Sequence, residues 1–274
     1  MKAIIIRRKK LGFAIKKVVA LSKENLSWIR SDKVLPAADL YIRWGCTAQV
    51  PCKNVLNKVS AIHTVCDKKG FRQLLMEKAQ DIIPFTFFKV EDAVYPAIVR
   101  PKHHAQGKRL YLVNDEVELH KAVGKCGHDW YASEYIQKQK EYRVFVLQGR
   151  VLWVAEKIPA NPEDIAWNVA KGGKFINVKW NDWPLRAVKV ALKSMELSGL
   201  DFGGVDVMTN SDNKPFVIEI NSAPSQTSPY RQECTAKGFD WVIKNESKEH
   251  IPLIKEKGGY LKFIHPAIDP KAKV

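Results

Sequence analysis

The spacing of apolar residues along the N-terminal part of the chain predicts alternating strands and helices. Short apolar runs at residues 2–7 and 39–44 indicate strands, and the segment 11–21 indicates a short helix. Residues 1–65 are therefore expected to form a small α/β lobe.

Two longer segments have the apolar period of an amphipathic helix. In 67–80, one stripe is formed by Phe71, Leu74, Leu75 and Ala79. Asp67 stands where an N-cap is expected. In 183–200, the stripe is formed by Ala187, Val190, Ala191 and Met195.

The rest of the chain mixes strand-like and helix-like patterns, which predicts an α/β (α+β) protein. Further helices are expected at 115–125 and 232–245. Further strands are expected at 83–86, 95–100, 109–113, 130–137, 141–147 and 151–158. We expect a central lobe at 66–137 and a C-terminal lobe at 138–274.

A turn-forming cluster at 210–214 separates two apolar runs, 204–208 and 215–220, and predicts an antiparallel hairpin. Centring the hairpin between residues 212 and 213 places Asp206 opposite Glu219. Side chains alternate along a strand, so one face should carry polar groups and the other should be apolar and buried. The residues expected on the buried face are Val205, Val207, Ile218 and Ile220.

The polar face of this hairpin brings together Asp206, Glu219 and Asn221. Two carboxylates and an amide oxygen are ligands that suit Mg²⁺. The alternative is a hairpin whose outer face is acidic but binds no metal. The glycines before Asp206 and the small-residue loop 222–225 favour the metal site, because both let a ligand approach.

Composition indicates a globular protein with reduced cysteines. Hydrophobic residues make up 46% of the 274 residues, and no run approaches the length of a membrane span. The five cysteines form no CxxC pair, which favours a cytoplasmic location without disulfides. No membrane partner is expected.

The formal net charge of +16 predicts an affinity for anions. A nucleotide pocket needs some of these cations, and a nucleic acid or another polyanion is a possible partner for the rest. The basic residues are spread along the chain rather than gathered in one run.

The sequence Gly-Val-Asp-Val-Met at 204–208, followed by Glu-Ile-Asn at 219–221, resembles the metal-binding end of the ATP-grasp carboxylate–amine ligases. Ribosomal-protein glutamate ligases, glutathione synthetases and D-Ala–D-Ala ligases are members of that superfamily. The resemblance implies an ATP-grasp fold, with a small N-terminal lobe and two lobes that clamp the nucleotide. It also implies that Asp206, Glu219 and Asn221 hold Mg²⁺ (or Mn²⁺) against the ATP phosphates.

The resemblance extends to residues that would bind the phosphates. Lys68 matches a nucleotide-binding lysine at a helix start, and Arg100 stands where lysine is usual. Gln106 and Gly107 match the glutamate-ligase branch, whereas Arg109 replaces a common glycine. Arginine can hold phosphate in a bidentate way, so Arg100 keeps the charge and changes the geometry.

The segment from residue 134 onward resembles the hinge at which the superfamily binds adenosine. Glu134, Tyr135 and Ile136 would then line the adenine pocket, and Glu141 would bind ribose. Catalytic roles fall to Arg143, which suits a phosphate or a substrate carboxylate, and to Asn168, placed near the transferred phosphate.

These residues together imply an ATP-dependent ligase that joins a carboxylate to an amine through an acylphosphate. Small-molecule acids and amines, amino acids or peptides among them, are the expected substrates. Three alternatives stay open: a basic nucleic-acid-binding protein, a ligase that modifies a polyanionic target, and an ATP-grasp kinase.

Overall fold

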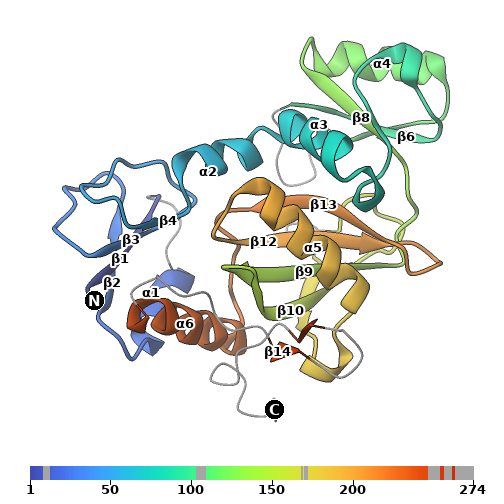
Figure 1. The fold of residues 1–274 in the computed structure, drawn as a ribbon. Helices are drawn as coiled ribbons and strands as arrows, with labels where there is room; N and C mark the ends of the chain where they lie inside the picture. The colour runs from blue at the N-terminus through green and yellow to red at the C-terminus, as the bar shows by residue number, and fades with distance from the viewer. Residues whose placement is uncertain are drawn as a thin grey trace.

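Three sheets and six α-helices make up most of the described chain, shown in the computed structural model of Figure 1. The structure describes residues 1–8, 13–102, 109–167, 169, 172–245, 254–255 and 261–262. Parallel and antiparallel sheets occur together, so the predicted α/β (α+β) class is confirmed.

The N-terminal sheet is parallel and has the strand order β2-β1-β3-β4. All five residues of β1 and of β3 are buried, as expected for strands covered on both faces. The helix α1 (Phe13–Leu21) follows β1. The strands are β1 (Ala3–Arg7), β2 (Leu26–Arg30), β3 (Leu40–Trp44) and β4 (Val55–Leu56). The two predicted strands are confirmed, and β2 and β4 were not predicted.

Two consecutive helices lead out of this sheet, where the sequence pattern predicted one. The helix α2 (Val59–Cys66) comes first, and α3 (Lys68–Lys78) follows after a single residue. That residue is Asp67, whose Oδ1 accepts a hydrogen bond from the Gly70 amide at 3.0 Å. The predicted N-cap is therefore confirmed.

The second sheet is antiparallel and has the order β5-β8-β6-β7. The helix α4 (Glu116–Cys126) packs against it and is capped by the side chain of Asp115. The strands are β5 (Thr86–Phe87), β6 (Ala97–Pro101), β7 (Tyr111–Val113) and β8 (Trp130–Glu134). Short 3-10 turns also occur, among them η1 (Gln80–Ile82), η2 (Val90–Asp92) and η4 (Trp180–Asp182).

The third sheet is antiparallel, has the order β11-β10-β9-β12-β13 and contains the predicted hairpin. The helix α5 (Leu185–Ser198) covers one part of it, and α6 (Pro229–Lys244) packs near β10 and α1. The strands are β9 (Lys140–Leu147), β10 (Arg150–Ile158), β11 (Lys174–Asn177), β12 (Phe202–Thr209) and β13 (Pro215–Asn221). A separate pair is formed by β14 (Ile254–Lys255) and β15 (Leu261–Lys262).

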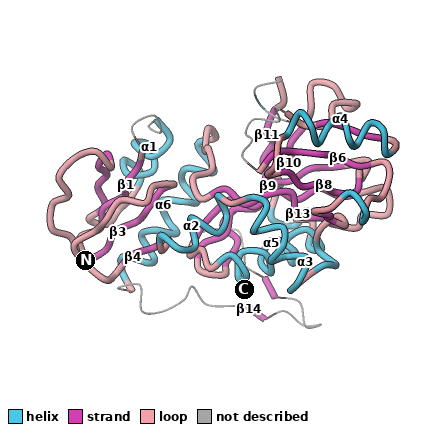
Figure 2. Tube along the Cα trace, turned by 90° about the horizontal axis from the view of Figure 1, so that it is seen from above, coloured by secondary structure: helices cyan, strands magenta, loops and turns pink. Residues whose placement is uncertain are grey.

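The N-terminal sheet lies at one end of the molecule and the sheet with α4 at the other (Figure 1, Figure 2). The three sheets fall within residues 1–65, 66–137 and 138–274, and the division into three lobes stays a prediction. Among the described residues, no helix combines the length and apolarity needed to cross a membrane.

Candidate active site

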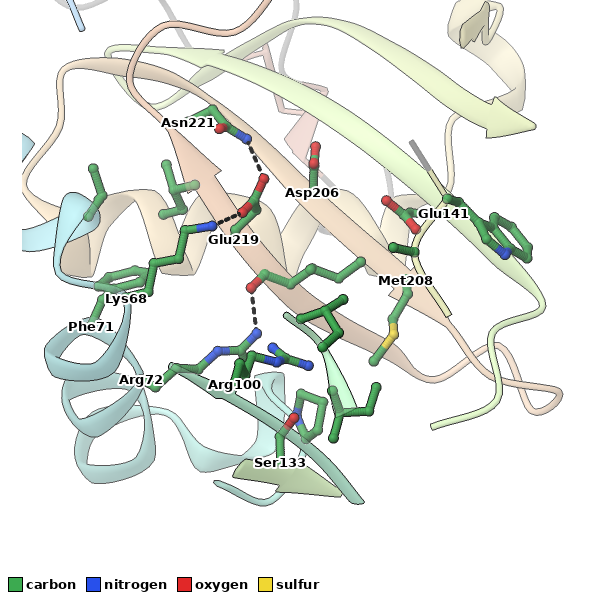
Figure 3. Close-up of a pocket in the computed structure, with 18 of the residues that line it drawn as sticks. Lys68, Phe71, Arg72, Arg100, Ser133, Glu141, Asp206, Met208, Glu219 and Asn221 are labelled. Atoms are coloured by element: carbon green, nitrogen blue, oxygen red, sulfur yellow. Dashed lines mark hydrogen bonds and ion pairs between the residues drawn. The ribbon is translucent and has the colours of Figure 1, made fainter. Parts of the chain in front are cut away.

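The hairpin β12–β13 has the predicted register at the residues that matter for the site. Asp206 pairs with Glu219, and Gly204 pairs with Asn221. Figure 3 shows the side chains of Asp206, Glu219 and Asn221 on the same side of this hairpin.

The prediction that Ile218 is buried on the apolar face of the hairpin is wrong. The register shifts after Asp206, so that Val207 pairs with Val217 and Ile218 is the additional residue of a bulge. A bulge changes which face the following residues occupy. Ile218 is consequently half-buried and lines a cleft.

Asp206 is buried among cations. Arg143 donates two hydrogen bonds to it, Nε to Oδ1 at 2.6 Å and Nη2 to Oδ2 at 2.7 Å. Lys157 Nζ lies 3.5 Å from Oδ2. Burial alone would raise the pKa of Asp206, but the two cations outweigh it and lower the pKa to about 2. The carboxylate is therefore ionised at neutral pH.

Glu219 is held by a different cation. Lys68 Nζ at the start of α3 donates to its Oε2 at 2.6 Å, and the Asn221 amide donates to its Oε1 at 3.1 Å. Burial favours the neutral acid, yet Lys68 outweighs it and lowers the pKa of Glu219. The predicted nucleotide contact Lys68 thus lies directly beside a predicted metal ligand.

Glu141, the predicted ribose ligand, is 3% exposed and paired with two lysines. Lys138 Nζ donates to Oε2 at 2.8 Å, and Lys157 Nζ donates to Oε1. Burial would lower the pKa of Lys157, but Asp206 and Glu141 raise it, so this lysine is charged. Lys157 therefore links the Glu141 end of the site to the Asp206 end.

These groups line one cleft of about 730 Å³, a size suited to a ligand such as a nucleotide. Glu134, Tyr135 and Ile136 line the same cleft, next to Trp167. The described lining has seven cationic side chains and four anionic ones, an excess of three positive charges. The cations are Arg8, Lys68, Arg72, Arg100, Lys138, Arg143 and Lys157, and the anions are Glu134, Glu141, Asp206 and Glu219.

Of the two predicted departures, Arg100 lies in β6 and Arg109 lies two residues before β7. Arg100 lines the cleft, and its guanidinium lies 5.6 Å from the centre of the Tyr131 ring. Arg109 has φ +58°, in the left-handed region that favours glycine. This conformation explains why glycine would suit position 109. The predicted contacts Gln106, Gly107 and Asn168 lie outside the described residues.

Four cations of the cleft were missed by the sequence analysis: Arg8, Arg72, Lys138 and Lys157. Lys157 had a usable signal, because β10 pairs with β9 and alternation puts Lys157 on the face of Arg143. Arg72 had a weaker signal, because it stands three residues before Leu75, at the edge of the apolar stripe of its helix, but the pattern does not show what that edge contacts.

The loop after Asn221 is packed between two glycines. A Cβ at Gly204 would come within 2.8 Å of Pro224 Cβ, and a Cβ at Gly45 within 2.5 Å of Ala223 Cβ. Gly45 also has φ +63°. The close approach expected at the glycines before Asp206 is therefore made by the chain's own loop.

The donor chemistry of this site fits a magnesium ion. Two ionised carboxylates and an amide oxygen are hard-oxygen donors, and Mg²⁺ is bound by few protein ligands, with water and phosphate as the others. Across the described ranges, no three His, Cys, Asp or Glu side chains gather as a metal cluster. The third candidate ligand is the amide of Asn221.

Comparison with known proteins relates this chain to a family of known fold. The RimK-like ATP-grasp domain model matches residues 55–236. The D-alanine–D-alanine ligase of Anaeromyxobacter dehalogenans is 29% identical over 143 residues, covering 48% of this chain and 46% of that protein. A probable alpha-L-glutamate ligase 2 of Hahella chejuensis is 24% identical over 207 residues, covering 69% and 66%. The chain thus spans about half the length of the first of these relatives and about two thirds of the second.

Solved structures show the same fold. A RiPP-associated ATP-grasp ligase of Chryseobacterium gregarium, in complex with ADP and a leader and core peptide, has a TM-score of 0.64 at 16% identity. The match covers 91% of this chain and 98% of that one. The ATP-grasp fold that the resemblance implied is confirmed, and the family model covers more than half of the chain. The chain therefore belongs to the RimK-like ATP-grasp family.

Proposed function

We propose that this protein is an ATP- and Mg²⁺-dependent ligase that joins a carboxylate to an amine through an acylphosphate. The observation that carries the proposal is the pairing of Asp206 with Glu219 across the hairpin, in a cleft with three excess positive charges. Membership of the ATP-grasp family supports ATP as the substrate.

In this proposal Asp206, Glu219 and Asn221 would hold Mg²⁺. The ion would supply neutralising charge to the phosphate oxygens. Glu134, Tyr135 and Ile136 would bind adenine, and Glu141 would bind ribose, because all four line the cleft.

The cations of the chain would stabilise the transferred phosphoryl group. Lys68, Arg100 and Arg143 come from three different elements and line the same cleft. An oxygen of the substrate carboxylate attacks the γ-phosphorus, and ADP leaves. The amine then attacks the acyl carbon, phosphate leaves, and an amide forms. Such chemistry rests on positioning and charge stabilisation rather than on a protein nucleophile.

Amino acids or peptides are the proposed substrate class. The relatives are ligases named for D-alanine and L-glutamate, and a structural neighbour was solved with a peptide. The test is ADP release from Mg-ATP in the presence of a panel of amino acids, peptides and amines. We expect release to require one acid and one amine, and a product mass equal to their sum less one water.

Two results would contradict the proposal. ADP release that needs an acid but no amine would identify a kinase. Salt-sensitive binding of RNA or DNA without ATP consumption would identify a nucleic-acid-binding protein, as the net charge of +16 would allow.

A further inference from the structure

We propose that Arg72 and Arg100 together form a seat for a phosphate group of the bound nucleotide. The inference rests on the proposed function and adds a residue, Arg72, that neither the sequence pattern nor the family resemblance indicated. It also gives Arg100 a partner.

Arg72 is a buried cation with an unused donor. Its side chain extends from α3 and is 4% exposed. Nη2 donates to the Ile218 carbonyl, whereas Nη1 is buried and has no hydrogen-bond partner among the described residues. A buried guanidinium with a free donor is costly unless something accepts from it.

Arg100, which lines the same cleft as Arg72, also has an unused donor. Its Nε is buried without a hydrogen-bond partner in the described part of the chain, and the side chain lines the cleft. Figure 3 shows Arg72 and Arg100 approaching each other from α3 and β6.

The two guanidinium groups are both positively charged and repel each other. Burial lowers the pKa of Arg72 to about 10, and the charge of Arg100 adds to that effect. The nearby carboxylate of Glu219 pairs with Lys68 instead, and within the described ranges no carboxylate forms an ion pair with either arginine. An anion that accepts from both guanidinium groups would remove this repulsion.

Phosphate is the anion class that fits best. Its oxygens accept several charge-assisted hydrogen bonds, and paired guanidinium groups match that geometry. The two arginines line the same cleft as Glu219 and Lys68, on the wall formed by α3 and β6 (Figure 3). A triphosphate held at Asp206 and Glu219 would therefore lie within the same cavity as the seat.

The alternative is a purely structural role for Arg72, based on its hydrogen bond with Ile218. Arg72 could serve only to fix the bulge that precedes Glu219. In that case its loss would weaken all ligands of the cleft alike. A phosphate seat predicts a loss only for ligands that carry phosphates.

The test compares Arg72→Met, Arg72→Lys and wild type in the full chain by calorimetric titration. The probes are Mg-ATP, adenosine and inorganic tripolyphosphate. Because Arg72→Met removes charge-assisted hydrogen bonds, we expect it to weaken the binding of Mg-ATP and of tripolyphosphate by about 10- to 100-fold. The affinity for adenosine should change less than about twofold. Arg72→Lys keeps the charge and should recover part of the loss.

The matched control is Arg150→Met, because Arg150 also has a buried Nε without a hydrogen-bond partner in the described residues but does not line this cleft. It should leave all three affinities unchanged. Equal weakening of adenosine and tripolyphosphate by Arg72→Met, or no weakening of tripolyphosphate, would overturn the phosphate seat. The proposed ligase function is tested by a different result: it is wrong if wild type releases no ADP with any acid and amine. In that case the titration with tripolyphosphate still tests the phosphate seat.

Discussion

Replacing Asp206 with asparagine should destabilise the protein as well as impair its activity. The carboxylate balances two buried cations, Arg143 and Lys157, and all three side chains are at most 11% exposed. Removing one partner of a buried pair typically costs about 3–5 kcal/mol. That is a large part of the total stability of about 5–15 kcal/mol usual for a protein.

A double-mutant cycle separates the pair from other effects of the substitution. Asp206→Asn, Arg143→Met and the combined variant are unfolded in urea at pH 7 and followed by tryptophan fluorescence. We expect a coupling free energy of at least about 2 kcal/mol, because the double variant no longer buries an unbalanced Arg143. The exposed pair Lys193–Glu196, treated in the same way, should give less than about 0.5 kcal/mol.

The coupling free energy should decrease at acid pH. The pKa of Asp206 falls from its ordinary value of 3.8 to about 2, so its stabilising contribution is present above pH 4 and is lost as the pH falls toward 2. A pKa shift of this size corresponds to about 2 kcal/mol of folding stability at neutral pH. A coupling below about 0.5 kcal/mol at pH 7, or one that already disappears near pH 6, would refute the reasoning.

Three further predictions concern single positions. Glu219→Gln should raise the Mg²⁺ concentration needed for half-maximal ADP release more than about tenfold. It should cost little stability, because its partner Lys68 is partly exposed, and an unchanged metal requirement would contradict the assigned site. Gly204→Ala should displace Pro224, 2.8 Å from the added Cβ, and lower ADP release, whereas unchanged kinetics would show that the loop tolerates the shift. Asn57→Ala should cost about 3 kcal/mol in urea unfolding, since this fully buried side chain makes hydrogen bonds with three backbone groups at the start of β12. Asn57→Gly, which suits φ +63°, should lose less if backbone strain contributes.

The order of residues along the chain predicts the hairpin and most of the elements around it. The pairs nearest the turn are one residue away from the predicted register, and the bulge at Ile218 restores the predicted pairing of Asp206 with Glu219. The antiparallel pairing itself follows from the turn-forming residues between the two runs. The cap at Asp67 likewise depends only on a side chain and an amide three residues on. Such features are local, and local geometry is encoded in neighbouring residues.

Contacts between elements far apart in the chain set which cations meet the carboxylates. Lys68 reaches Glu219 because α3 lies beside β13, whereas Arg143 and Lys157 reach Asp206 because β10, β9 and β12 are neighbours in the third sheet. Arg72 likewise depends on the placement of α3, because it donates a hydrogen bond to the carbonyl of the bulge residue Ile218. Long-range packing sets these contacts, and the pattern of apolar residues records which face is buried but not what lies against it.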